Sequence, residues 1–222
     1  GNNLVIGGGG SIPAIAGDTR QLTGQPTALA AAQTTQPDDG GADTITTGNG
    51  DNIVLGGFGG DTITTGAGND TVLGDNGLLG YTNGVLTTVT STDLVAGTGG
   101  NDTINTGDGN NLVIGGVGSD TITTLDGVDV VIGDNGTITN DRTGALQQVI
   151  TGDPLLGGSD TISTGGGDDI VAGGAQGDTV NAGAGNDVVF GDGGRVNVSG
   201  GGTQLDIVSI DVVSGGDDTL DG

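Results

Sequence analysis

Residues 40–77 read GGADTITTGNGDNIVLGGFGGDTITTGAGNDTVLGDNG, and this stretch decides the fold. An aspartate or asparagine returns in it every nine residues, at Asp43, Asn52, Asp61 and Asp70. Glycine-rich residues precede each of these side chains, and three apolar or threonine-rich residues follow it. Glycine allows the backbone conformations that tight turns need, whereas β-branched triplets favour short strands. The nine-residue period therefore predicts an alternation of turns and short strands.

A longer period contains the shorter one. The stretch returns at residues 99–136 and 157–194, and a fourth copy starts at Gly215. The leading aspartates of the four copies, Asp43, Asp102, Asp160 and Asp218, recur at a nearly constant interval of about 58 residues. Because both ends of the chain fall inside a copy, we expect the chain to be a piece of a longer array.

The two periods divide the chain into units. Residues 1–39 hold the end of a preceding repeat and an irregular insertion, and residues 215–222 begin a further unit. The three complete units are residues 40–98, 99–156 and 157–214. In each of them the nonapeptides come first (40–77, 99–136, 157–194) and an insertion follows (78–98, 137–156, 195–214).

The nonapeptides resemble a known calcium-binding repeat. GGFGGDTIT (residues 56–64) and GGVGSDTIT (residues 115–123) match at every position the RTX (repeats-in-toxin) pattern G-G-x-G-x-D-x-U-x, in which U is a large apolar residue. This resemblance implies an all-β parallel β-roll, or β-solenoid, with two nonapeptides in each 18-residue coil. It also implies Ca²⁺ held by the position-six aspartates and by turn carbonyls, and export by type I secretion.

The candidate metal ligands are mostly the position-six side chains. They are Asp43, Asn52, Asp61, Asp70, Asp102, Asn111, Asp120, Asp129, Asp160, Asp169, Asp178, Asp187 and Asp218, and we add Asp75, Asp134 and Asp192 from the GDNG motif and its GDGG variant. Acids 18 residues apart lie one rung apart, roughly 4.8 Å, and repel unless a cation lies between them. The net charge of −25 would be matched by between 12 and 13 divalent ions, close to one per nonapeptide.

Several nonapeptides depart from the pattern. Asn52 and Asn111 replace the aspartate, so their turns carry less charge and are expected to bind calcium more weakly. Gln176 stands at a position-four glycine, and Leu125 stands at a position-two glycine. We expect the turns of Asp178 and Asp129 to be the ones affected.

The two kinds of strand predict two unlike sheets and a cover. One kind reads Thr-Ile-Thr, with outward threonines such as Thr44, Thr46, Thr62 and Thr64, whereas the other is apolar at nearly every position. A strand that is apolar on both sides is buried on both sides. We therefore expect a cover over Ile53, Leu55, Leu112, Ile114, Val188 and Phe190.

The insertions are the candidate cover. Alternating strands at residues 85–90, 145–150 and 205–210 each follow a glycine-containing turn, which indicates a β-hairpin about every 58 residues. Residues 9–39 form a longer insertion with no assigned shape.

Composition excludes several classes of function. The chain has three Arg residues and no Lys, Glu, His or Cys. Most general bases, nucleophiles and transition-metal sites therefore cannot be built. We therefore expect no enzymatic activity. We also expect no nucleic-acid binding, because phosphates would be repelled, and no membrane insertion.

The favoured function is structural. We expect a calcium-stabilised part of a long secreted rod at the cell surface, such as an adhesin stalk, a surface-layer or sheath protein, or a filament. Further copies of the repeat, joined head to tail, would be its partners. The alternative is the C-terminal calcium-binding module of a type I-secreted enzyme. Ice binding by the threonine columns is less favoured, because Asn105, Ser163, Asn181 and Asp221 interrupt them.

Overall fold

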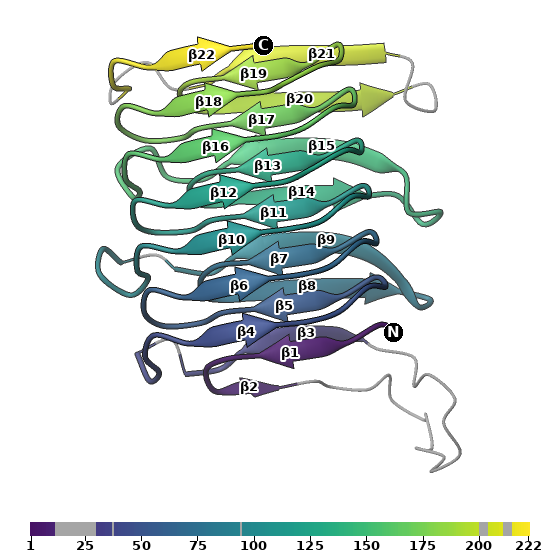
Figure 1. Ribbon diagram of the computed structural model, residues 1–222, viewed down its shortest axis with the longest axis vertical. Coiled ribbons are helices and arrows are strands. Elements are labelled where there is room, and N and C mark those ends of the chain that lie inside the picture. Colours follow the sequence, from purple (N-terminus) through teal and green to yellow (C-terminus); the bar gives the residue numbers. More distant parts are fainter. Residues whose placement is uncertain (12–29, 37, 94, 200–203, 211–214) are drawn as a thin grey trace.

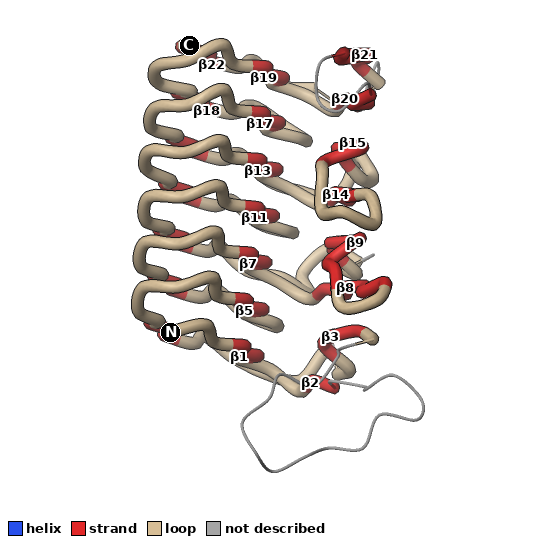
Figure 2. Tube along the Cα trace, turned by 90° about the vertical axis from the view of Figure 1, so that its right-hand side faces the viewer, coloured by secondary structure: helices blue, strands red, loops and turns tan. Residues whose placement is uncertain are grey.

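The computed structural model describes residues 1–11, 30–36, 38–93, 95–199, 204–210 and 215–222. These residues form strands and turns, with no helix among them. The described part accordingly contains no helix of the length and apolarity that a membrane span requires. The strands stack into a flat-sided roll, and a third sheet lies along one side of it (Figures 1 and 2).

The roll consists of two parallel seven-stranded sheets. The threonine sheet holds β4 (Thr44–Thr46), β6 (Thr62–Thr64), β10 (Thr103–Asn105), β12 (Thr121–Thr123), β16 (Thr161–Ser163), β18 (Thr179–Asn181) and β22 (Thr219–Asp221). The apolar sheet holds β1 (Leu4–Ile6), β5 (Ile53–Leu55), β7 (Thr71–Leu73), β11 (Leu112–Ile114), β13 (Val130–Ile132), β17 (Ile170–Ala172) and β19 (Val188–Phe190). The parallel β-roll expected from the nonapeptide pattern is confirmed.

The register follows the two sequence periods. Within a unit, each strand pairs with the equivalent strand of the next coil, as Thr44 does with Thr62. Across an insertion the partner lies more than twice as far along the chain, as between Thr62 and Thr103 or between Thr121 and Thr161. The insertions therefore leave the roll and return to it without breaking either ladder.

The insertions form the third sheet, which we call the hairpin sheet. Its eight antiparallel strands, in order, are β2 (Gly10–Ser11), β3 (Ala31–Thr34), β8 (Gly77–Thr82), β9 (Val85–Ser91), β14 (Gly136–Asn140), β15 (Leu146–Thr151), β20 (Gly194–Ser199) and β21 (Gln204–Ser209). Neighbouring hairpins also pair with each other, through β3–β8, β9–β14 and β15–β20. Even the long first insertion contributes β2 and β3, although residues 12–29 within it lie outside the described part.

Two apolar cores result from these three layers. Inside the roll, the middle residue of each strand points inward, so that Ile63, Val72, Ile104 and Val113 are fully buried. Between the apolar and hairpin sheets, residues such as Leu55 and Ile114 pack with Leu79 and Ile138. The predicted cover over the apolar strands is thus present. Leu55 and Ile114 are buried, and Ile53, Leu112, Val188 and Phe190 are partly buried against it.

The departures from the repeat pattern fit the turns. Gln176 takes the left-handed conformation of the glycine it replaces, with φ of 71°, and its Nε2 donates to the Gly157 carbonyl at 2.8 Å. Asp178 stays buried at 1% exposure. Leu125 is exposed, and Asp129 behind it is fully buried. Neither substitution therefore displaces the acid of its turn.

Candidate metal-binding turns

The position-six side chains lie in two files, one along each edge of the roll. We name each edge after the residue that is most common at position one of its turns. The turns of the glycine edge lead into the threonine sheet. The turns of the threonine edge lead into the apolar sheet. The glycine edge carries Asp43, Asp61, Asp102, Asp120, Asp160, Asp178 and Asp218. The threonine edge carries Asn3, Asn52, Asp70, Asn111, Asp129, Asp169 and Asp187.

Each file is a hydrogen-bonded ladder. On the glycine edge the backbone N–H of Asp43 donates to Oδ1 of Asp61 at 2.7 Å, and that of Asp61 donates to Oδ1 of Asp102 at 2.7 Å. The threonine edge repeats this arrangement, for example from Asn111 to Oδ1 of Asp129 at 2.8 Å. One oxygen of each carboxylate is thus used to hold the preceding rung.

The second carboxylate oxygen has no such partner. On the glycine edge, Oδ2 is buried and accepts no hydrogen bond within the described residues in Asp61, Asp102, Asp120, Asp160 and Asp178. A carbonyl oxygen lies beside it. A Cβ placed on Gly115 would clash with Oδ2 of Asp120 and with the carbonyl oxygen of Gly133. Glycine at position one therefore leaves room for two facing oxygens, neither of which can donate a hydrogen bond while the carboxylate is ionised.

The electrostatics of the glycine edge are unfavourable to bare carboxylates. Burial raises the pKa of Asp61 from 3.8 to about 6 and that of Asp120 to about 7. The pKa of Asp102 rises to about 8, mainly through burial and further through the charges of Asp120 and Asp61. The pKa of Asp160 rises to about 10 by burial, with the Asp134 charge adding to the shift. A cation beside these oxygens would reverse this effect.

The threonine edge is more polar. Burial again raises the pKa of Asp129 and of Asp169, and in both cases a nearby threonine hydroxyl, from Thr124 or Thr164, partly lowers it. Three of the seven positions on this edge carry asparagine instead of aspartate.

The donor set fits calcium. Calcium takes six to eight hard oxygen ligands, both carboxylate and carbonyl, in adaptable geometry. The orphaned Oδ2 atoms and the neighbouring glycine carbonyls are such ligands. In the part of the chain that the structure describes, no three acidic side chains converge on one point. Turn carbonyls would therefore supply much of the coordination of each ion.

Asp75, Asp134 and Asp192 have a different environment. Asp75 accepts backbone N–H groups of the next unit on both oxygens, from Gly100 at 3.2 Å and from Val117 at 2.6 Å. Asp134 does the same with Gly158 and Ala175. Asp192 lies against Gly215, the first residue of the next copy. Asp75 and Asp134 are thus main-chain acceptors that fasten one unit to the next, and ion binding by all three stays a prediction.

The pKa values of Asp75 and Asp134 are strongly raised, although both carboxyl groups accept main-chain N–H groups. Burial raises the pKa of Asp75 to about 10, and the charges of Asp102 and Asp93 add to the shift. Burial likewise raises the pKa of Asp134 to about 8, whereas the N–H groups of Ala175 and Gly158 lower it. They therefore add two more buried carboxyl groups with raised pKa values beside the glycine edge.

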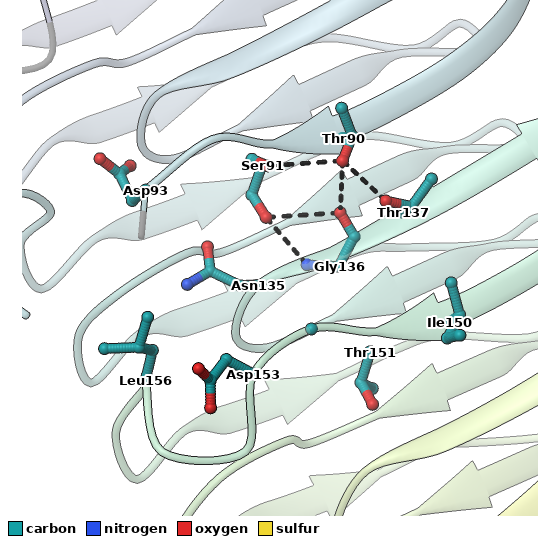
Figure 3. Close-up of a pocket in the computed structure, with 11 residues that line it drawn as sticks. Thr90, Ser91, Asp93, Asn135, Gly136, Thr137, Ile150, Thr151, Asp153 and Leu156 are labelled. Carbon is teal, nitrogen blue, oxygen red and sulfur yellow. Dashed lines mark hydrogen bonds between the residues drawn. The ribbon is translucent and has the colours of Figure 1, made fainter. Parts of the chain in front are cut away.

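A cavity of about 110 Å³ lies where two hairpins meet (Figure 3). Most of its polar groups already have hydrogen-bond partners. The hydroxyls of Thr90 and Thr137 are 2.7 Å apart, and Asp153 accepts the N–H of Leu155. The buried amide of Asn135 has no partner among the described residues. The cavity has room for several water molecules, to which this amide offers a donor and an acceptor.

Comparison with known families agrees with this geometry. The model of the RTX calcium-binding nonapeptide repeat, described as four copies, matches residues 38–63, 46–77, 88–122, 106–137, 156–180 and 163–198. The matches together cover more than half of the chain. The chain belongs to the RTX calcium-binding nonapeptide repeat family. It is thus a calcium-binding repeat module, and RTX repeats are typical of secreted, extracellular proteins. No curated protein matches the chain.

Sequence reasoning about the RTX repeats missed two features of the site. It treated Asp75 and Asp134 as equivalent to the nonapeptide acids, although each follows a strand by two residues and lies outside the nine-residue series. It also did not identify buried Asp93, which accepts the N–H and the amide of Asn76 at 3.0 Å. Asp75 and Asp134 recur with the long period of about 58 residues, but a period does not show which N–H groups a side chain accepts, because each of these contacts joins a turn to an insertion or to the following unit.

Proposed function

We propose that this RTX segment is a calcium-stabilised structural repeat of a long secreted rod, such as an adhesin stalk, a surface-layer or sheath protein, or a filament. Calcium binds the folded turns and thereby shifts the folding equilibrium. Millimolar calcium outside a cell would fold the segment after export, and the low calcium of the cytosol would not. The proposal assigns the segment no catalytic role.

One observation carries the proposal. All three sheets run through the three complete units without a break, and the hairpins pair across unit boundaries as well as within them. Units joined in this way form one continuous body instead of a string of separate domains. This is the architecture that a stiff spacer requires.

Small-angle X-ray scattering tests the proposal. Chains carrying one, two and three tandem copies of residues 40–214 are compared in millimolar calcium. The expected result is a constant cross-section and a maximum dimension that rises in proportion to copy number. Copies that scatter as separate bodies on flexible joints would contradict the rod, and they would favour the alternative of a calcium-binding module attached to a secreted enzyme.

A further inference from the structure

The side-chain amides of the asparagines on the threonine edge donate hydrogen bonds within their own turns. Nδ2 of Asn52 donates to the carbonyls of Gly48 at 2.8 Å and Gly50 at 2.6 Å, which are positions two and four of the same nonapeptide. Nδ2 of Asn111 donates to the corresponding carbonyls of Gly107 at 3.1 Å and Gly109 at 2.9 Å.

Asn3 has a comparable contact. Its Nδ2 donates to the Gly1 carbonyl, again position four, at 2.8 Å. All three asparagines thus direct the amide nitrogen at turn carbonyls.

The amide orientation is fixed by the ladder. Oδ1 of Asn111 accepts the backbone N–H of Asp70 at 3.0 Å, as Oδ1 of the aspartate does in the aspartate rungs. An amide oxygen can accept this N–H and an amide nitrogen cannot, so Nδ2 must be the atom that faces the carbonyls. The nitrogen therefore has the place that Oδ2 has in an aspartate turn.

The two turn types consequently differ in what they lack. Oδ2 of Asp70, on the same edge, is buried and has no hydrogen-bond partner among the described residues. A carboxylate oxygen in that place cannot donate to turn carbonyls, so an aspartate turn needs a cation between its oxygens. The asparagine turn already has donors there.

From this difference we infer that the asparagine turns of this chain do without calcium, because the side-chain amide takes the place of the ion. The inference rests on calcium binding by the aspartate turns and not on the rod. It replaces the expectation that Asn52 and Asn111 hold calcium weakly. It also makes the two edges unequal, with ions along the whole glycine edge and at only some positions of the threonine edge.

Counting bound calcium in substituted chains tests the inference. Asn52→Asp and Asn111→Asp each exchange the amide nitrogen for a carboxylate oxygen. Equilibrium dialysis followed by metal analysis is expected to show about one additional ion per substitution. Asn110→Asp is the matched control. It adds the same charge one residue away, at a position where Asp51 already accepts an N–H in the same way, and should leave the count unchanged.

Asn52→Ala covers the case in which the aspartate variants do not fold. If the turn holds no ion, removing the amide leaves the calcium count unchanged. A lower count for Asn52→Ala, or an unchanged count for folded Asn→Asp variants, would overturn the inference alone. An unsubstituted chain that binds no calcium would overturn both the inference and the calcium-stabilised fold.

Discussion

At the scale of single residues, the arrangement of oxygens along the glycine edge depends on the space around position one. Gly115 has no left-handed φ, so its requirement is steric, and an added Cβ would meet Oδ2 of Asp120 and the Gly133 carbonyl. Gly115→Ala is expected to destabilise the calcium-loaded protein by about 1–3 kcal/mol, as overpacking does. It should also raise the calcium concentration at which the chain folds. Calcium titration followed by circular dichroism measures both effects.

Gly41→Ala is the control for that substitution. A Cβ on exposed Gly41 would meet nothing within 4 Å, so its effect should stay within about 0.5 kcal/mol. Equal effects of the two substitutions would show that the space at position one does not matter.

Protons should partly replace calcium at the same carboxylates. In the calcium-free fold the pKa of Asp102 is about 8 and that of Asp120 about 7, against an ordinary value of 3.8. Between these values the folded chain binds more protons than the unfolded chain, so stability falls as pH rises. The stabilisation is complete below about pH 4 and is lost as pH rises through about 7 to 8. Circular dichroism in excess chelator should therefore show more β-structure at pH 5 than at pH 8. The opposite trend would contradict the raised pKa values of these buried carboxyl groups.

At the scale of elements, the hairpins matter through the face they turn to the roll. Ile138 on β14 is fully buried between the hairpin and apolar sheets, whereas its neighbour Thr139 points to the other side. Ile138→Ala should lower the free energy of unfolding in calcium by about 2–5 kcal/mol. Denaturant unfolding at fixed calcium measures this loss.

Thr139→Ala on the outer face should change the same quantity by less than about 1 kcal/mol. A small effect at both positions would mean that the hairpins cover the roll without stabilising it.

Most of these elements could be predicted from the sequence, because the repeats state them many times. The triplet Thr62–Thr64 alone predicts a strand, an inward isoleucine and two outward threonines, and all are present. The pairing of Leu79 with Val89 inside one hairpin could also be predicted. The pairing between hairpins, such as that of Val89 with Ile138, could not be predicted, because a repeat period does not say which insertions lie side by side. The amide contacts of Asn52 required atomic positions.

At the scale of the whole molecule, charge and calcium should together decide whether the chain is folded. A net charge of −25 concentrated on one narrow body opposes compaction, and three Lys or Arg residues cannot offset it. In chelator at neutral pH we expect little regular structure by circular dichroism. Millimolar calcium should produce a β spectrum, and magnesium should be a poor substitute because it requires near-octahedral geometry. A β-rich spectrum in excess chelator at pH 8 would contradict this prediction.

The unequal offsets between paired strands, short within a unit and long across an insertion, have a mechanical consequence. The strands lie across the long axis in Figure 1, so a pull along that axis separates them one rung at a time, like a zipper. Freeing a rung within a unit releases roughly 60 Å of extended chain, and freeing one across an insertion releases roughly 140 Å. A force–extension trace in an optical trap should therefore alternate short and long steps in calcium. Steps of one uniform length would mean that tension is shared by whole units. The rod would then unfold one unit at a time instead of one rung at a time.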